Sequence, residues 1–195
     1  MKQLKVYPEC NVDTNLVGYI LGTHVMHKST CNEVVKAVNA SDSFAIGIID
    51  ADKRMATMDK GFKEYTEHGK ADGKTIHLTM YIHNDCKRYM FTVKPAMDKF
   101  ILDAAKEQGI DMVTAGYPET LDKFKKETKR IQAANDPKLR KLFSMIKDNP
   151  ELQCLRNTLK YLMSRQYNSN TDTAKDFFDG TKGTEELDML LAEKP

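Results

Sequence analysis

The sequence predicts an α/β protein with a largely parallel sheet flanked by helices and an α-helical C-terminal region. Two observations lead to this fold class. Short apolar runs rich in β-branched residues are separated by amphipathic helical patterns in the first half of the chain, and every clear pattern after residue 110 is helical. We therefore expect an α/β domain over residues 1–110 and a helical region over residues 111–195 that packs on it.

The composition is that of an ordinary soluble globular protein. Of 195 residues, 41% are apolar and 30% charged, and the net charge of +2 neither indicates nor excludes a nucleic-acid partner. The four cysteines and five histidines lack the spacing of a zinc site, which predicts free thiols in a reducing cytoplasm. No secretory signal is visible, and no run approaches the roughly 20 apolar residues of a membrane span. A cytoplasmic protein without membrane contact is expected.

The chain opens with one strand and two helices. Residues 4–8 form a short apolar run that stops at a proline, which predicts a strand. Apolar residues at helical spacing predict a helix over residues 13–21, which Gly22 closes. Thr30 and Glu33 form the capping-box pattern of a second helix.

A second set of elements follows. Residues 44–50, FAIGIID, are apolar on both faces, as in a central strand of a parallel sheet. A helix is expected over residues 55–67. The runs 75–84 and 88–95 resemble strands, joined as a hairpin or lying as neighbours, and residues 96–109 show the strongest helical pattern.

The second half of the chain is predicted to be helical throughout, with Asp-Pro and Asn-Pro pairs marking two of the breaks. The expected helices cover residues 119–134, 137–147, 150–167, 171–179 and 184–193.

Acidic residues follow two of the predicted strands. Glu9 comes directly after the first strand, and Asp50 and Asp52 end the second. Functional sites of open α/β sheets form beyond the carboxyl ends of the strands, and residues i and i+2 of an extended segment point the same way. Converging carboxylates repel each other unless a cation joins them, and Mg²⁺ prefers oxygen ligands. We expect these three residues to hold Mg²⁺ or Mn²⁺, whereas a polar loop is the alternative. Asp13 is expected to be a helix N-cap rather than a further ligand.

These residues resemble the Toprim domain of topoisomerases, primases and nucleases of the overcoming-lysogenization-defect (OLD) type. The resemblance spans roughly residues 3–105 and rests on VYPECNVDTNLVGYIL and FAIGIIDADKR, where one strand ends in Glu9 and a later one in Asp50-x-Asp52. It implies metal-dependent cleavage of nucleic-acid phosphodiesters in bacterial or phage defence, with Glu9 as general acid/base or metal ligand and both aspartates as ligands. The sequence departs from the family pattern in carrying Cys10 where glycine is common and in lacking a Walker A loop.

Basic residues concentrate in residues 123–147, where either a phosphate-binding surface or an ordinary solvated helix face is consistent with the pattern. The residues expected to contact DNA or RNA are Lys53, Arg54, Lys94, Lys126 and Arg130.

A non-enzymatic function is the alternative. The chain would then be a catalytically inactive α/β binding or regulatory protein, whose helical region serves a protein partner or a homo-oligomer. Absence of cleavage, together with no effect of divalent ions on melting, would favour this alternative.

Overall fold

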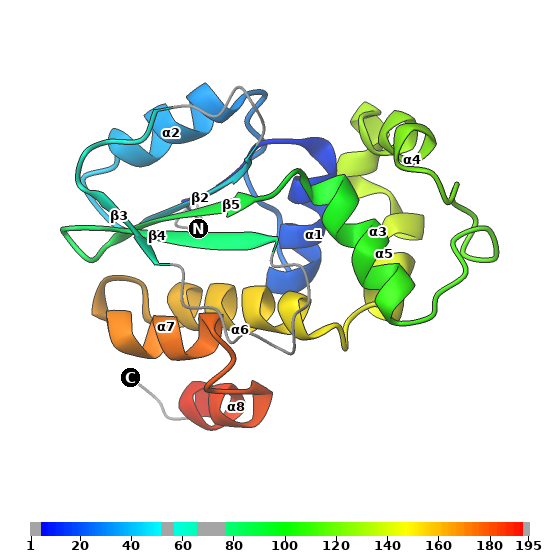
Figure 1. Cartoon of the computed structure of the whole chain (residues 1–195). Helices are drawn as coiled ribbons and strands as arrows, with labels where there is room; N and C mark the ends of the chain where they lie inside the picture. The colour runs from blue at the N-terminus through cyan, green and yellow to red at the C-terminus, as the bar shows by residue number, and fades with distance from the viewer. Residues whose placement is uncertain (1–4, 52–56, 66–76, 193–195) are drawn as a thin grey trace.

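A mixed five-stranded sheet forms the centre of the molecule, with strand order β1-β2-β5-β4-β3 (Figure 1). The computed structural model describes residues 5–51, 57–65 and 77–192. The strands are β1 (Val6–Pro8), β2 (Ala45–Asp50), β3 (Phe62–Tyr65), β4 (Leu78–His83) and β5 (Arg88–Val93).

The expectation of a largely parallel sheet is wrong for one half of it. Strands β1, β2 and β5 run parallel, but β4 and β3 are antiparallel to their neighbours. Only residues 84–87 separate β4 from β5, and so short a link permits a hairpin but no parallel crossover. The helix expected over residues 55–67 is also wrong, because β3 occupies part of that range; residues 52–56 and 66–76 lie outside the described part of the chain.

The helices largely follow the predicted ranges, although the one expected over residues 119–134 stops early and a 3₁₀ turn, η1, follows it. None of the helices in the described ranges combines the length and apolar character that crossing a bilayer requires. The helices are α1 (Asn11–Leu21), α2 (Cys31–Asn39), α3 (Met97–Glu107), α4 (Leu121–Thr128), η1 (Ile131–Asn135), α5 (Pro137–Met145), α6 (Pro150–Arg165), η2 (Gln166–Asn168), α7 (Thr171–Phe178) and α8 (Thr184–Ala192).

Local capping chemistry explains several helix ends. The Thr30 side chain accepts a hydrogen bond from the Glu33 backbone N–H at the start of α2, as predicted. Asp136 and Asn149 do the same for α5 and α6, each followed by proline at the first helical position. Gly22 ends α1 in the left-handed conformation, with φ of 64°.

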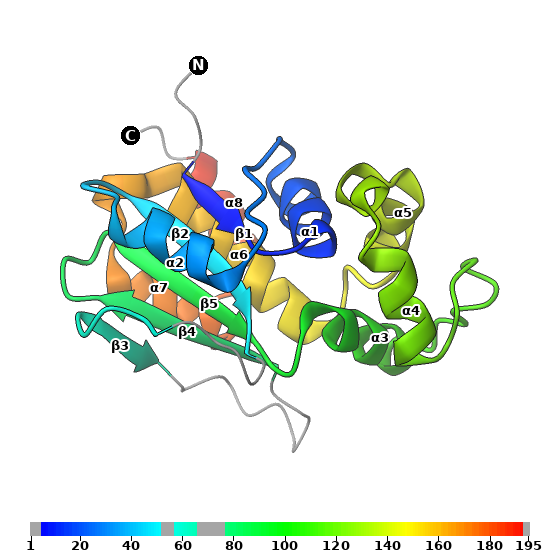
Figure 2. The same ribbon diagram turned by 90° about the horizontal axis from the view of Figure 1, so that it is seen from above.

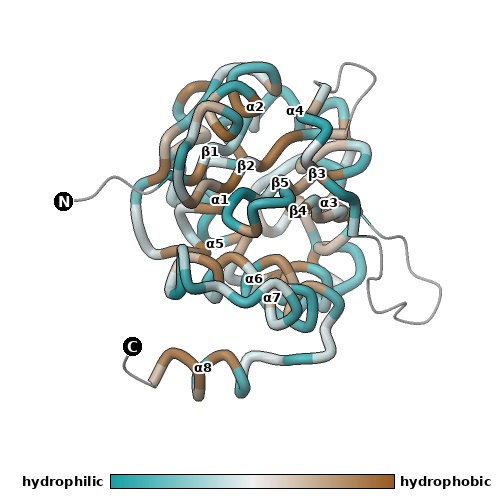
Figure 3. The backbone as a smooth tube through the Cα atoms, turned by 90° about the vertical axis from the view of Figure 1, so that its left-hand side faces the viewer, coloured by the Kyte–Doolittle hydropathy of each residue, from teal (hydrophilic) through white to brown (hydrophobic). Residues whose placement is uncertain are grey.

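Helices cover both faces of the sheet. Helix α2 lies on one face, and α6 and α7 lie on the other, with α8 outside them (Figures 2 and 3). Side chains of β2 alternate accordingly: Ala45 and Ile49 pack with the valines of α2, whereas Ile46 and Ile48 join the core on the opposite face. Gly47 permits the close approach of α2, because a Cβ there would lie 2.8 Å from Val34 Cγ1 and would also meet the Met90 sulfur.

Candidate metal centre

The ends of β1 and β2 bring Glu9 and Asp50 together. The two strands are parallel neighbours with Pro8 opposite Ile48, so the residues that follow them emerge at one edge of the sheet. The Glu9 backbone N–H donates to the Ile48 carbonyl at 3.0 Å, and the Asp50 backbone N–H donates to Glu9 Oε2 at 3.0 Å. The expected meeting of these two acids is therefore observed.

Asp50 is also fixed by the helix that follows β5. Its Oδ1 accepts a hydrogen bond from the Met97 backbone N–H, at the first residue of α3, over 2.9 Å. The N-cap residue Ala96 has no side-chain oxygen to do this. Asp50 thus substitutes for the missing cap and is held in one orientation at the base of α3.

Asp13 is completely buried beside this pair, and the expectation that it is the N-cap of α1 is wrong, because it is the third helical residue and completes a capping box with Cys10. The helix begins earlier, at Asn11, so Cys10 is the N-cap and Asp13 is the third helical residue. One carboxylate oxygen of Asp13 accepts from the Cys10 backbone N–H at 3.2 Å, and the other lies 2.9 Å from the Cys10 thiol. Its carboxylate is therefore turned back toward Cys10, the residue that follows Glu9.

Asp98 is a member of the site that the sequence did not indicate. It lies in the first turn of α3, is 6% exposed, and accepts a hydrogen bond from the Thr128 hydroxyl at the end of α4. An acid in the first turn of a helix is common for reasons of helix stability alone, so nothing in the sequence marked it out.

The carboxylate cluster, defined as Glu9, Asp13, Asp50 and Asp98, contains two carboxyls with raised pKa values, Asp13 and Asp50. Burial, together with the charges of Glu9 and Asp98, raises the pKa of Asp13 to about 7, even though its hydrogen bonds from Cys10 oppose the shift. Burial and then the charges of Asp13, Glu9 and Asp98 raise the pKa of Asp50 to about 8, against the hydrogen bond from Met97. Without a nearby cation, the Asp13 and Asp50 carboxyls therefore tend to keep their protons near neutral pH.

The donor atoms of the cluster suit a hard divalent cation, because carboxylate oxygens are the ligands that Mg²⁺ prefers. Within residues 5–51, 57–65 and 77–192, no group of three or more His, Cys, Asp or Glu side chains is arranged to hold a metal ion. Three of the residues expected in the site, Asp52, Lys53 and Arg54, lie outside the described residues.

The other basic residues expected to contact nucleic acid are exposed or near the cluster. Lys94 is exposed directly after β5, at the same sheet edge as Asp50. Lys126 is exposed on α4, and Arg130 follows α4 with its guanidinium 2.8 Å from Glu127.

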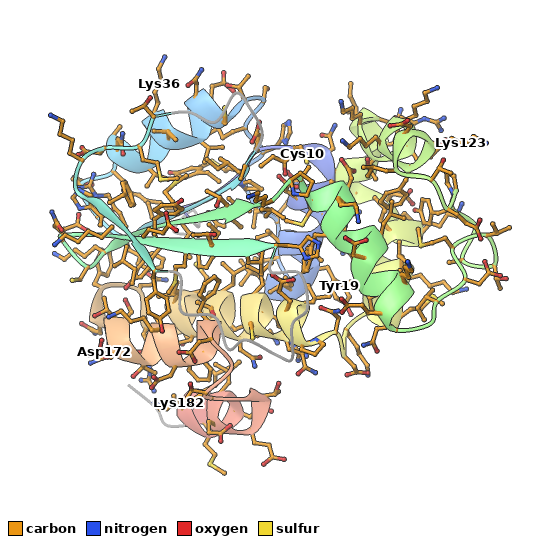
Figure 4. The ribbon with its side chains drawn as sticks, in the orientation of Figure 1. Cys10, Tyr19, Lys36, Lys123, Asp172 and Lys182 are labelled. Atoms are coloured by element: carbon orange, nitrogen blue, oxygen red, sulfur yellow. The ribbon has the colours of Figure 1, made fainter. Side chains whose placement is uncertain are left out.

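The end of α4 lies beside the cluster. Thr128 bonds to Asp98, and the side-chain amide of Asn11 donates to the Lys129 carbonyl at 3.3 Å. The segment beyond is anchored by buried Asn15 of α1, whose amide nitrogen donates to the carbonyls of Ala133 at 2.8 Å and Asp136 at 2.9 Å. Figure 4 accordingly shows Cys10 between α2 and α4.

No protein-family model matches this chain, and neither the curated proteins nor the solved structures contain a significant match to it.

Proposed function

We propose that the chain is a Mg²⁺-dependent enzyme of the Toprim type that cleaves nucleic-acid phosphodiesters. The observation that supports this is the convergence of Glu9 and Asp50 at the ends of adjacent parallel strands, with Asp13 and Asp98 buried behind them. Buried carboxylates at such close quarters are costly to ionise, and a divalent cation relieves that cost.

In this proposal Glu9 and Asp50 hold the ion together with Asp52. Mg²⁺ bound there neutralises charge on a phosphodiester and lowers the pKa of a water molecule. The chain's own groups set the geometry: the Asp50 backbone N–H positions the Glu9 carboxylate, and the Met97 N–H positions Asp50. A bound cation would in turn favour the ionised forms of Asp13 and Asp50, whose pKa values are raised without it.

A purely structural role for Asp50, as the cap of α3, is the competing explanation. Asp50→Asn separates the two because asparagine keeps the oxygen that accepts from Met97 and loses only the charge. We expect this variant to fold, to lose cleavage of DNA and RNA in Mg²⁺ or Mn²⁺, and to lose the rise in melting temperature that these ions give the wild type.

Glu9→Gln tests the second ligand, and Asp172→Asn, an exposed change on α7, is the matched control. The control is expected to keep both cleavage and the metal-dependent rise in melting temperature. A wild type that neither cleaves nucleic acid nor melts higher with divalent ions would overturn the proposal and favour a non-enzymatic binding protein. Full cleavage activity in Asp50→Asn would show that Asp50 is not a ligand of the catalytic metal and would overturn the assigned site.

A further inference from the structure

A basic hollow of about 440 Å³ lies beside the candidate metal centre, between the end of β1 and helix α2. Nothing in the sequence pattern pointed to it, because its walls come from the α1–α2 connection and one side of α2. Those walls, which we call the α2 hollow, are formed by His27, Lys28, Ser29, Glu33, Lys36 and Ala37.

The α2 hollow is tied directly to the strand that carries Glu9. The Lys28 backbone N–H donates to the Pro8 carbonyl at 2.9 Å, one residue before Glu9. The Lys28 ammonium lies 5.4 Å from the centroid of the Tyr7 ring, a cation–π distance that holds this side chain near β1. The hollow therefore adjoins the carboxyl end of β1, where the cluster begins.

His27 is also fixed from the side of the cluster. The hydroxyl of Thr14 has one hydrogen, which it donates to the Cys10 carbonyl at 2.8 Å, because a carbonyl can only accept. The His27 Nδ1, 3.1 Å from the same hydroxyl, must then be the donor of that contact. In the neutral ring Nε2 is then an acceptor, so His27 could donate to an anion only when it carries both protons, and the two lysines are the cationic groups of the hollow.

The charges in the hollow favour an anion. Lys28 and Lys36 contribute two ammonium groups, and Glu33 is the single acid among the lining residues. Glu33 already accepts a hydrogen bond from the Ser29 backbone N–H at 2.9 Å, as part of the capping of α2. The excess of positive charge lies next to a cluster that itself repels anions, so the hollow offers an anionic ligand a place beside the metal site.

A second basic flank lies across the cluster. Lys125 and Lys129 stand four residues apart at the end of α4, so they share one side of that helix. The Asn11 contact holds this end of α4 against the start of α1. Figure 4 shows the arrangement, with α2 and Lys36 on one side of Cys10 and α4 on the other.

We propose that the α2 hollow binds a backbone phosphate of a polynucleotide whose adjacent segment crosses the carboxylate cluster toward Lys125 and Lys129. This inference rests on the proposed function for what happens over the cluster. It extends that function by assigning Lys28 and Lys36 to substrate binding and by requiring a chain of phosphates rather than a single one.

The test measures binding without cleavage. Asp50→Asn protein in EDTA is titrated into a fluorescently labelled single-stranded oligonucleotide, with and without the added changes Lys28→Gln and Lys36→Gln. We expect the added pair to weaken binding roughly tenfold and to reduce the slope of log K against log salt by about one to two. The control pair, Lys175→Gln and Lys182→Gln, removes the same charge on the α7 side and is expected to change affinity less than twofold.

Equal binding by the hollow variant and the control variant would overturn the inference. Competition by inorganic phosphate or a mononucleotide as strong as that by the oligonucleotide would overturn it too, because the ligand would then be a small phosphate. Far-UV circular dichroism melts serve as the control that each variant is folded. If the wild type never cleaves while the Lys28/Lys36 dependence holds, the proposed activity fails and the binding site stands.

Discussion

Asp50 caps α3, and the metal-ligand role proposed for it makes a conflicting demand on the same side chain. As the cap of α3 it needs only an oxygen that accepts from Met97, and a neutral side chain does this equally well. As a metal ligand it needs a negative charge, which burial and the neighbouring acids make costly. A stable fold alone does not require an ionisable group here, and a strongly raised carboxyl pKa is typical of a functional site.

The conflict predicts a pH-dependent effect of Asp50→Asn on stability. The pKa of Asp50 is about 8 in the folded protein and 3.8 as its ordinary value. The folded state therefore holds a proton that the unfolded state releases, so stability from this group is full below about pH 4 and is lost as pH rises through 8. In EDTA, Asp50→Asn should raise the free energy of unfolding at pH 8.5 by about 1–3 kcal/mol more than at pH 5.

Urea unfolding at the two pH values measures this difference, and Asp172→Asn provides the control curve. Parallel pH dependence in the two variants would show that the Asp50 carboxyl is not held protonated by the fold.

At the level of single residues, the sequence identified those site members that follow a positional rule. Glu9 and Asp50 were found because Glu9 follows one strand and Asp50 ends another, and parallel neighbours end at one edge. Asp13 and Asp98 lie in first turns of helices, where acids are common for reasons of capping and dipole. Only the packing of α1 and α3 against the strand ends turns them toward the cluster, and packing is invisible in a local pattern.

Among the elements, β4, α3 and α6 are joined by one buried histidine. His77 immediately precedes β4 and is 3% exposed. Its Nδ1 lies 2.8 Å from Glu151 of α6, and its Nε2 lies 3.0 Å from Asp103 of α3. Glu151 also accepts from the Leu78 backbone N–H at 2.9 Å, so the same carboxylate holds the start of the strand.

This junction predicts a loss of stability in His77→Gln that shrinks at high pH. Burial alone would lower the pKa of His77, but the hydrogen bonds and charges of Glu151 and Asp103 outweigh it and raise the pKa. The stabilising charge is thus fully present below about pH 6.5 and is lost as pH rises through the raised pKa. We expect a cost of about 2–3 kcal/mol at pH 6 and a smaller one at pH 9, measured by urea unfolding.

His83→Gln, at the other end of β4, is the matched control for this change. Its surroundings differ, with Asp85 at 3.1 Å as the acidic neighbour. A cost for His77→Gln that stays constant from pH 6 to pH 9 would contradict the ionic role of the junction.

Element types were predictable where caps and periodicity were strong, as in α2, α5 and α6. The strand β3 was missed because it is short, only partly buried and polar at its centre, and its pairing with β4 depends on distant residues. The antiparallel half of the sheet followed from the short link after β4, which the sequence left open between a hairpin and neighbouring strands.

In the whole molecule, the apolar core extends across residue 110, the predicted boundary between the α/β domain and the helical region. One continuous cluster includes side chains of the sheet, of α1 and α3, and of α4 to α8. Phe91 of β5, for example, lies against Phe178 of α7 with ring centroids 5.7 Å apart. Helices α6 and α7, which follow residue 110, lie over the sheet face opposite α2 (Figure 1).

A fragment of residues 1–110 should therefore fail to fold. Removing the C-terminal helices exposes Phe91 and its neighbours on the sheet face that α6 and α7 cover, and α1, α2 and α3 bury too little apolar surface to compensate. Amide chemical-shift dispersion in NMR spectra measures this, with the full chain as the control. A well-dispersed spectrum from the fragment would establish two independent domains.

Buried Asn15 links helix α1 to the segment that follows α4. Its amide bridges α1 to the η1–α5 connection, and Arg140 donates to its oxygen at 3.0 Å, so these hydrogen bonds help to fix the position of the α4 end relative to α1. In the proposed binding mode, an oligonucleotide too short to reach from the α2 hollow to Lys129 would contact only one of the two basic sites. Binding affinity should then rise sharply at one oligonucleotide length. In Asn15→Ala, the affinity should instead rise gradually with length.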